Sequence, residues 1–301
     1  MSVSGWIILD KPLGLGSTQA VAAVKRNLRE AGFGKKVKVG HGGTLDPLAT
    51  GVLPIALGEA TKLAGRMLDA TKAYAFTVAF GSQTDTLDLE GAVIATSDVR
   101  PSRPEIEAIL PRFTGPIAQV PPAYSALMVD GRRAYDLARA GEAVELKSRQ
   151  VTIHALALTE TGPETATFIA HVSKGTYIRS LARDIALALG TVGHVTVLRR
   201  LKAGPFGIEA AISLDKLNEV GKGAPLENVL LPLEAGLVDI PALDLGPEQA
   251  RAVQQGRVLA GLPLNDGLYW ARAGTTPIAL VELSGGSLTV SRGFNLSDVA
   301  E

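Results

Sequence analysis

The chain has 301 residues, of which 46% are hydrophobic and 20% charged, a composition that suits one large folded domain plus a small one and excludes a disordered protein. The sequence contains no cysteine, which excludes disulfides, thiolate catalysis and cysteine zinc sites. No run of 18 apolar residues is present, and no charged region followed by an apolar stretch opens the chain. We therefore expect neither a membrane-spanning helix nor a signal peptide, and a cytoplasmic location.

The formal net charge is zero, but the charges are segregated along the chain. Residues 1–50 contain seven Lys or Arg against three acidic residues, and residues 171–210 contain six against two. Residues 211–301 contain six against eleven. A protein that binds one face of an RNA needs a basic patch rather than a basic total. The segregation permits such a patch, although an ordinary solvated surface accounts equally well for the charge counts alone.

The N-terminal region predicts a strand followed by a helix. The run Gly5–Leu9 is typical of a short buried strand, and a turn follows it. We predict that the next helix is capped by Ser17 or Thr18 and ends at Gly32. A dinucleotide-binding loop is not favoured, because Gln19 stands where its third glycine is needed and no P-loop sequence occurs.

Residues 39–54, with the sequence VGHGGTLDPLATGVLP, predict a glycine-rich loop that carries one acid, Asp46. Glycines let the backbone lie close to a ligand, and the proline after Asp46 holds the local backbone extended. His41 lies five residues earlier, and the apolar run Val52–Leu57 is typical of a buried strand that anchors the loop. By itself, an Asp-Pro pair in such a loop is more typical of an Asx-turn. Metal binding is not favoured, because no second carboxylate or histidine lies at ligand spacing.

Regular elements are predicted farther along the chain. Apolar periodicity and capping signals predict strands at 73–80, 151–158 and 166–172, helices at 102–110 and 178–189, and short β-rich segments after residue 237. Tyr177 and Arg179 then lie at the entrance of the last of these helices. Because a cation is unfavourable at the positive end of a helix dipole, Arg179 indicates an anionic partner.

Several segments together resemble one family. The stretch Gly42–Leu53, GGTLDPLATGVL, resembles the catalytic motif of the bacterial tRNA pseudouridine-55 synthases, the TruB family. The other matching segments lie in the family's order along the chain: the opening Leu-Asp-Lys-Pro-x-Gly at 9–14, the Lys-x-Tyr at 72–74, the run 84–91, the run 173–185 and the run 198–206. The resemblance extends over about 200 residues.

The resemblance implies an α+β protein with the pseudouridine synthase fold, a mixed and mostly antiparallel sheet with flanking helices. Residues 1–236 are then the catalytic domain, and a segment at about 120–150 is a mobile insertion that clamps RNA. Residues 237–301 are then a small β-rich C-terminal domain of the PUA type, an expectation based on fold-level analogy.

The resemblance also implies catalytic roles. Asp46 is the essential residue, and Arg179 pairs with it and fixes its orientation. Tyr74 contacts the target base and is a candidate for proton transfer, although a strand tyrosine is usually part of the core. Asp85 is a further candidate, to hold a positive group near the site.

Other residues are expected to contact the substrate. The resemblance implies that Tyr177 and Leu198 lie against the target ring and that His41 fills the space left by the flipped base, although a loop histidine bonded to the backbone is a serious alternative. Basic side chains are expected at the RNA backbone. The candidates are Lys11, Lys36, Lys62, Arg132, Arg199 and Arg200.

The implied reaction converts uridine 55 in the T loop of tRNA to pseudouridine after the base has flipped out of its stack. The expected partner is the T stem-loop of tRNA, bound by a monomer with no cofactor, no metal and no nucleotide. Asp46 either attacks C1′ to form a covalent adduct or removes the C2′ proton to form a glycal, and the sequence does not separate these routes. Two alternatives stay open: an RNA-binding folding helper for tRNA, and a metabolic enzyme that acts on free nucleotides, for which phosphate motifs are missing.

Overall fold

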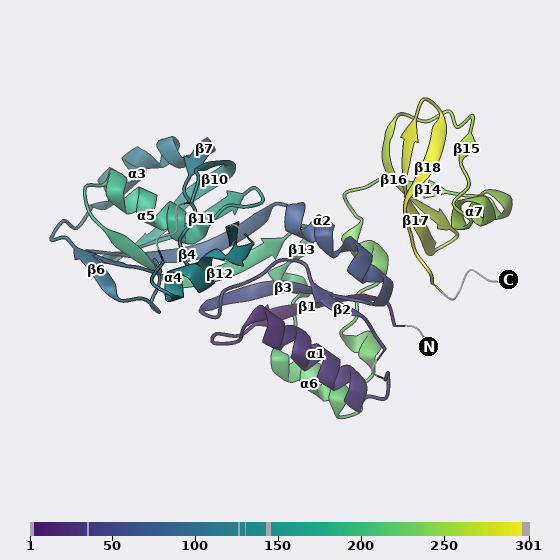
Figure 1. Cartoon of the computed structure of the whole chain (residues 1–301), viewed down its shortest axis with the longest axis horizontal. Helices are drawn as coiled ribbons and strands as arrows, with labels where there is room; N and C mark the ends of the chain where they lie inside the picture. The colour runs from purple at the N-terminus through teal and green to yellow at the C-terminus, as the bar shows by residue number, and fades with distance from the viewer. Residues whose placement is uncertain (1–2, 35, 126, 130, 143–145, 297–301) are drawn as a thin grey trace. The chain divides into compact units, whose positions relative to one another are not determined.

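The structure is a computed structural model that describes residues 3–34, 36–125, 127–129, 131–142 and 146–296. The chain folds into two compact units, and most of their helices and strands are labelled in Figure 1. The first unit comprises Met1–Asp46, Val52–Leu68 and Gly204–Glu301, and the second comprises Pro47–Gly51 and Asp69–Ala203. Each unit is therefore built from segments that are separated in the sequence.

The N-terminal part of the first unit contains a strand and a helix as predicted, with two differences. Strand β1 (Gly5–Lys11) continues two residues beyond the predicted end, and helix α1 spans Ser17–Glu30. The predicted cap is wrong, because the N-cap is Gly16, whose N–H donates to Oε1 of Gln19 at 2.8 Å. The predicted end is confirmed: Gly32 follows the helix with a φ of +86°, a conformation that favours glycine.

The remaining elements of the first unit follow from the same alternation of apolar runs and turns. They are β2 (Val39–His41), β3 (Ala49–Leu57), η1 (Gly58–Leu63), α2 (Ala64–Asp69), β13 (Phe206–Gly207), η3 (Ile208–Ala210), α6 (Leu214–Gly221), η4 (Leu226–Asn228) and η5 (Leu233–Gly236). Strand β3 and helix α2 each extend across a unit boundary. Strand β3 lies between β1 and β2 in the first unit. Trp6 of β1 is fully buried, donates from Nε1 to the carbonyl of Leu233 at 3.0 Å and packs on Phe206 with ring centroids 5.2 Å apart.

The C-terminal residues of the first unit form a sheet with its own core. Its strands are β14 (Ala242–Asp244), β15 (Leu259–Ala260), β16 (Gly267–Ala273), β17 (Thr276–Ser284) and β18 (Ser287–Gly293), in the order β14-β16-β17-β18-β15, with helix α7 at Pro247–Gln254. Buried side chains of α7, β16 and β17 share one hydrophobic cluster. The predicted β-rich C-terminal part is confirmed, while a domain boundary near residue 237 stays a prediction.

The second unit is built around a run of antiparallel strands. Its elements are β4 (Lys72–Phe80), β5 (Ser82–Thr84), β6 (Val93–Thr96), α3 (Arg103–Ile109), η2 (Leu110–Phe113), β7 (Gly115–Gln119), β8 (Met128–Val129), β9 (Arg132–Arg133), α4 (Ala134–Arg139), β10 (Arg149–Thr161), β11 (Thr165–Val172), α5 (Ile178–Ala188) and β12 (Gly193–Ala203). Strands β12-β4-β11-β10-β7 pair antiparallel in this order, and the first residues of β3 pair parallel with β12. The predicted α+β class with a mixed, mostly antiparallel sheet is confirmed.

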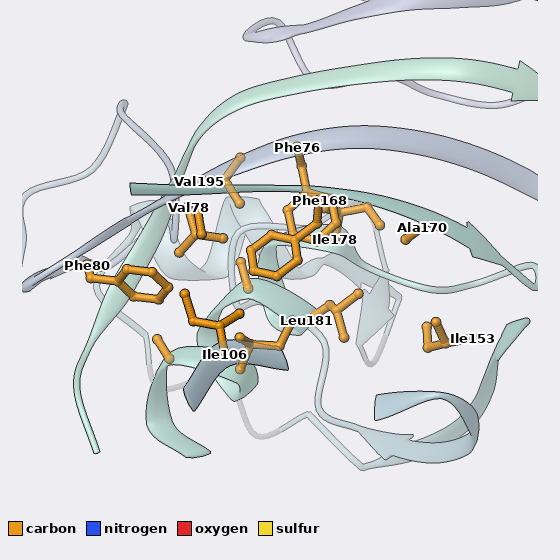
Figure 2. Packing of buried hydrophobic residues seen from close by; sticks show 14 of the residues in the cluster. Phe76, Val78, Phe80, Ile106, Ile153, Phe168, Ala170, Ile178, Leu181 and Val195 are labelled. Atoms are coloured by element: carbon orange, nitrogen blue, oxygen red, sulfur yellow. The ribbon is translucent and has the colours of Figure 1, made fainter. Parts of the chain in front are cut away.

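The core of the second unit lies between this sheet and helix α5 (Figure 2). Apolar residues at every second position of β4 face this side, so Phe76 stacks on Phe168 with ring centroids 5.2 Å apart. Leu181 of α5 is fully buried in the same cluster. Burying one such side chain stabilises the fold by about 1.5–3 kcal/mol. Tyr74 and Leu198 are partly buried and pack against this cluster.

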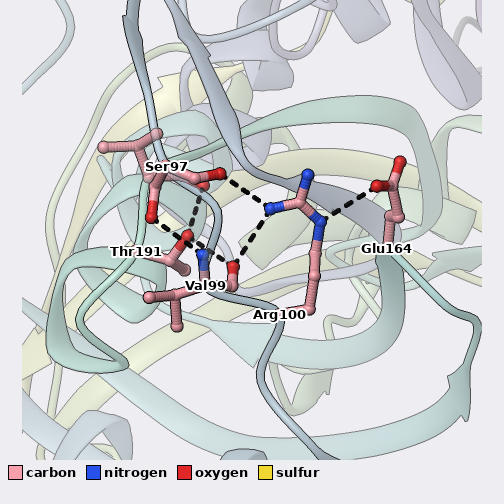
Figure 3. A network of polar contacts seen from close by, with 6 residues as sticks. Ser97, Val99, Arg100, Glu164 and Thr191 are labelled. Atoms are coloured by element: carbon pink, nitrogen blue, oxygen red, sulfur yellow. Dashed lines mark hydrogen bonds and ion pairs between the residues drawn. The ribbon is translucent and has the colours of Figure 1, made fainter.

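A polar network secures the connection between β6 and α3 (Figure 3). Arg100 donates from Nε to Oε1 of Glu164 at 3.0 Å and from Nη1 to the carbonyl of Ser97 at 2.7 Å. The hydroxyl of Thr191 donates to the carbonyl of Val99 at 3.0 Å. Gly81, next to the Arg100 guanidinium, has a φ of +99°, a conformation that favours glycine. The network joins segments that precede α3, β11 and β12, and thereby fixes the ends of the sheet.

A helix that crosses a bilayer needs about 20 predominantly apolar residues. Within the described ranges, no helix is both long enough and apolar enough to cross a membrane.

Candidate active site

The Asp46 segment is a loop only in its middle. Residues 42–48 connect β2 to β3, but Val39–His41 forms strand β2, in which His41 is opposite Ile55. The prediction of a loop from residue 39 was therefore wrong at its start, and His41 lies on a strand. Pairing with the long buried strand β3 outweighs the low strand preference of the neighbouring glycine, since strand propensity depends strongly on context.

The residue before Asp46 is fixed by helix α1. Leu45 is buried, its N–H donates to Oγ of Ser17 at 2.8 Å, and its carbonyl accepts from the same hydroxyl at 3.0 Å. Gly42 packs so closely on Met67 that a Cβ would collide with it. The backbone on the N-terminal side of Asp46 is thus held by protein contacts. The sequence predicted Ser17 or Thr18 as the helix cap and gave no sign of this contact, because the partners are 28 positions apart.

Arg179 lies at the entrance of α5, the position that the sequence predicted. Its side chain is buried there and is not a solvated surface charge. Its side chain is 7% exposed. Nη1 donates to the carbonyl of Thr86 at 2.7 Å and Nη2 donates to the carbonyl of Tyr124 at 2.9 Å. Buried charges are retained where they are paired and hydrogen-bonded. The plane of the guanidinium is thus fixed by two carbonyls from different parts of the second unit.

An acidic partner of Arg179 within the second unit is Asp88, with 3.5 Å between Nη1 and Oδ2. The sequence analysis considered Asp85 as a residue to hold a positive group near the site, and that role stays a prediction. Asp88 is buried, and its Oδ1 accepts from the hydroxyl of Thr86 at 2.6 Å. Asp85 accepts from the Tyr124 hydroxyl at 3.2 Å. Burial, followed by the charge of Asp85, raises the pKa of Tyr124.

The turn that carries Asp88 has an unusual backbone conformation. Leu87 has a φ of +63° although it is not a glycine, and a non-glycine residue in this region is strained by roughly 1–3 kcal/mol. It lies between Thr86 and Asp88, and both of these contact Arg179. Strain of this kind concentrates at functional sites, so the position of Leu87 supports a functional role for the Arg179 cluster.

Tyr74 and Leu198 lie on neighbouring strands of the second unit. Leu198 of β12 is opposite Phe76 of β4, and Tyr74 precedes Phe76 by two positions. Residues directly opposite each other, and residues two apart on one strand, share a face of a sheet. The structure therefore brings Tyr74 and Leu198 to the same face, where both pack against the core cluster.

Asp46 belongs to the first unit, whereas Tyr74, Tyr177, Arg179 and Leu198 belong to the second. The expected pairing of Asp46 with Arg179 therefore stays a prediction. Within the described part of the chain, no group of three His, Asp or Glu side chains is arranged to hold a metal ion.

The six expected RNA contacts lie in three kinds of environment. Lys11 and Arg200 are buried, which differs from the exposed position that a phosphate contact requires. Lys11 donates to the carbonyls of Pro12 and Leu15, at 3.1 and 2.6 Å, and so holds the turn after β1. Arg199 is half-buried and Lys36 is exposed.

The other two expected RNA contacts, Lys62 and Arg132, form ion pairs. Lys62 lies 2.7 Å from Glu59, and its ammonium also donates to the carbonyl of Gly293 at 2.8 Å. Arg132 lies 2.9 Å from Glu142, with both side chains about half exposed. An exposed pair of this kind is worth little to stability, so its charge can be shared with a ligand.

Lys72, at the start of β4, is partly buried and lies near other cations. Burial, followed by the charge of Arg200, lowers its pKa from the ordinary value of 10.5 to about 8. Lys174 acts in the same direction and Asp69 opposes it. The charge on this ammonium is therefore destabilised by its surroundings.

Solved structures of known proteins share this fold. A chain in the crystal structure of a Cbf5–Nop10–Gar1 complex matches with a TM-score of 0.75 and 27% identity, over 98% of this chain and 86% of the other. A chain in the structure of an H/ACA RNP bound to a substrate RNA containing 2′-deoxyuridine matches with a TM-score of 0.74 and 26% identity, over 99% and 87%.

Two relatives found by sequence share a higher identity with this chain than these solved structures do. The tRNA pseudouridine synthase B of Novosphingobium aromaticivorans is 78% identical over 304 residues, which is 99% of this chain and 100% of the relative. The protein of the same name from Zymomonas mobilis is 60% identical over 98% of this chain and 97% of its own. The fold and these relatives define the class of this chain as a pseudouridine synthase, which is an isomerase.

Family models give the closer assignment. The model described as TruB family pseudouridylate synthase (N terminal domain) matches residues 29–178, and the model described as tRNA pseudouridylate synthase B C-terminal domain matches residues 179–238. The chain belongs to the TruB family of pseudouridylate synthases. The resemblance seen in the sequence is thereby confirmed.

Proposed function

We propose that this enzyme converts uridine 55 in the T loop of tRNA to pseudouridine, with Asp46 as the essential group. The observation that carries the proposal is the segment Gly42–Leu53 with Asp46 at its centre, in a chain 78% identical to a relative named tRNA pseudouridine synthase B. The double hydrogen bond between Ser17 and Leu45 supports it, because it fixes the backbone next to the proposed reactive carboxylate.

The reaction is an isomerisation in which atoms balance without a co-reactant. The bond from N1 of uracil to C1′ breaks, the base rotates, a bond from C5 to C1′ forms, and the proton leaves C5 while N1 gains one. Asp46 either attacks C1′ to form a covalent adduct or removes the C2′ proton to form a glycal, and both routes use a fixed carboxylate. No step in this scheme requires a cofactor or a metal.

The proposed role of Arg179 is to orient Asp46. A guanidinium already held by the carbonyls of Thr86 and Tyr124 presents a rigid fork, so pairing with it loses little conformational freedom. Asp88 forms an ion pair with the same guanidinium and offsets part of its positive charge. Arg179 would thus hold the carboxylate of Asp46 in one orientation throughout the reaction.

The other proposed roles concern the base, which must leave its stack to reach Asp46 at a cost of a few kcal/mol. Tyr177 and Leu198 would lie against the flipped ring, and Tyr74 would contact it and take part in proton transfer. His41 would fill the space that the base leaves in the T loop. Contacts of this kind offset the cost of unstacking.

The substrate partner proposed is the T stem-loop of tRNA, bound by a monomer in the cytoplasm. We further propose that the insertion at about 120–150 closes over the T loop. In its described part, helix α4 buries only Ala134 and Leu137. Few buried contacts are the property that a closing segment needs.

The test is to map pseudouridine nucleotide by nucleotide in an unmodified tRNA transcript after incubation with wild type or with Asp46→Asn. We expect wild type to convert a single T-loop uridine, and Asp46→Asn to bind the transcript with similar affinity without converting it. Conversion at a different nucleotide would contradict the proposed substrate position. Binding by both proteins with conversion by neither would favour a tRNA-folding helper instead.

A further inference from the structure

Two polar residues face each other across neighbouring strands close to Tyr177. Gln119 is the last residue of β7, Arg149 is the first residue of β10, and the two are directly opposite in the antiparallel register. Residues opposite each other in such a pair project their side chains to the same face of the sheet. Neither residue was singled out by the sequence, because each lies at the end of a strand and far along the chain from Tyr177.

Gln119 binds the backbone of Tyr177. Its side chain is fully buried, and Oε1 accepts from the N–H of Tyr177 at 2.8 Å. Tyr177 is the N-cap of α5, with extended backbone angles and no cap bond from its own side chain. The amide of Gln119 therefore supplies, from another strand, a hydrogen bond that holds the residue at the helix entrance.

Arg149 binds the ring of Tyr177 and the turn before it. The guanidinium carbon lies over the tyrosine ring, 4.7 Å from its centroid, a position in which a cation is attracted to the face of an aromatic ring. Nη2 of the same side chain donates to the carbonyl of Gly175. One face of the tyrosine ring is thus covered by Arg149, and the turn that leads to it is tied to the same guanidinium.

The contacts come with unsatisfied polar atoms. Among the described residues, Nε2 of Gln119 and Nε of Arg149 are buried and have no hydrogen-bond partner. A buried donor without a partner destabilises a fold. The pair therefore gives less stability than a fully satisfied pair would, while it fixes both the backbone and the ring of one residue.

We propose that Gln119 and Arg149 are positioning residues that together clamp Tyr177 in the orientation in which its ring meets the target base. The inference rests on the proposed function, in which Tyr177 packs on the flipped uracil. Arg149 holds the ring from one face, so the substrate base uses the other contact surface of the ring. Since a misplacement of about 1 Å can lower a reaction rate on the order of 100-fold, loosening this clamp should slow the chemical step more than it weakens RNA binding.

The first experiment separates rate from affinity. Single-turnover rate constants and dissociation constants are measured on one tRNA transcript for Arg149→Met, Gln119→Met and their conservative counterparts Arg149→Lys and Gln119→Glu. We expect the two Met variants to react about 10- to 100-fold more slowly, with affinity for tRNA changed by less than about twofold and the unfolding midpoint nearly unchanged. Gln119→Glu, which keeps an acceptor, should recover most of the rate. Arg103→Met, which removes an exposed arginine of α3 paired with Glu107, is the control and should behave as wild type.

The second experiment asks whether the effect depends on the ring. Arg149→Met is combined with Tyr177→Phe, which keeps the ring, and with Tyr177→Leu, which removes it. We expect Arg149→Met to slow the Phe variant by nearly the same factor as wild type and to leave the Leu variant within about twofold of its own rate. An equal effect in all three backgrounds would overturn the clamp.

Three further outcomes identify which part of the proposal has failed. If Arg149→Met weakens tRNA binding and reduces its salt dependence while the single-turnover rate is unchanged, Arg149 is a phosphate contact and the clamp is refuted. If wild type itself converts no T-loop uridine, the proposed function fails and the clamp fails with it. If wild type is active and Tyr177→Leu retains full rate, only the role of Tyr177 and its clamp is lost.

Discussion

Helix α5 and helix α4 both lie in the second unit and both have arginines near their entrances, but the fold holds them differently. Helix α5 buries seven of its eleven residues, including Arg179, whereas α4 buries two of six. Arg179 is bonded to two carbonyls and to Asp88, while Arg132, just before α4, shares an exposed ion pair with Glu142. A charged side chain that the fold holds in one position suits a reaction in which the reacting groups need one fixed orientation. In the proposed function, an exposed charge such as that of Arg132 exchanges its carboxylate partner for a phosphate of the RNA.

The strongest test of this contrast removes the buried charge. Arg179→Met leaves Asp88 buried without this arginine, and loss of one partner of a buried pair costs about 3–5 kcal/mol. We expect a loss of that size in the free energy of unfolding, measured by urea denaturation. Asp88→Asn added to Arg179→Met should recover part of it, because the uncompensated carboxylate is gone. A loss below about 1 kcal/mol would mean that Arg179 is not held as the structure indicates.

Matched leucines in the two helices provide a second test. Leu181 of α5 is fully buried in the core cluster, whereas Leu137 of α4 is 9% exposed. Leu181→Ala should lower the free energy of unfolding by about 3–5 kcal/mol, because it removes buried contacts and leaves a cavity. Leu137→Ala should cost about 2 kcal/mol or less. Equal losses in urea unfolding would remove the proposed difference in how firmly the two helices are held.

The pH dependence of stability tests the lowered pKa of Lys72, at the start of β4. The folded pKa of Lys72 is lowered to about 8, so between about pH 8 and 10.5 the unfolded chain binds more protons at this residue than the folded chain does. The penalty from Lys72 is therefore fully present below pH 8 and is relieved as the pH rises toward 10.5. We expect Lys72→Met to be more stable than wild type at pH 7, with the difference shrinking from pH 8 upward. A difference that does not vary with pH would contradict the lowered pKa.

The smallest effect is expected at the exposed pair. Arg132→Gln breaks the contact with Glu142, but pairs of this exposure contribute only about 0.2–1 kcal/mol. The thermal unfolding midpoint should shift by little more than its measurement error, and the remaining difference should disappear in high salt. A loss comparable to that of Arg179→Met would show that the insertion is anchored as firmly as α5.

Most elements followed from the sequence because their signals are local. Alternating apolar residues predicted β4, and the run Ile178–Leu189 predicted α5 together with the entrance positions of Tyr177 and Arg179. Strand β2 was missed, since its three residues pair with β3 and a glycine in the middle gives no strand signal. The cap of α1 was assigned to a hydroxyl that instead binds Leu45. A hydroxyl at a helix start can therefore bind a distant backbone group instead of capping its own helix.

The residues around the α5 entrance could not be found in this way, since their contacts join distant parts of the chain. Thr86 and Arg179 are 93 positions apart, and Gln119 and Tyr177 are 58 apart. The sequence also offers two aspartates in the same short segment, and only the fold selects Asp88 over Asp85 as the partner of Arg179. The motif residues were identified by resemblance, whereas the residues that hold them in place required the structure.

The most direct test of the account compares Arg179→Lys with Arg132→Gln on the same tRNA transcript, measuring the single-turnover rate constant and the dissociation constant for both. Arg179→Lys keeps the charge but loses the planar fork. We expect a rate lowered on the order of 100-fold with affinity within about twofold. For Arg132→Gln we expect an unchanged rate, with weaker binding and a salt slope reduced by about one. A loss of affinity in Arg179→Lys together with a normal rate, or a loss of rate in Arg132→Gln, would contradict the division between a fixed chemical site and an exchangeable RNA-binding surface.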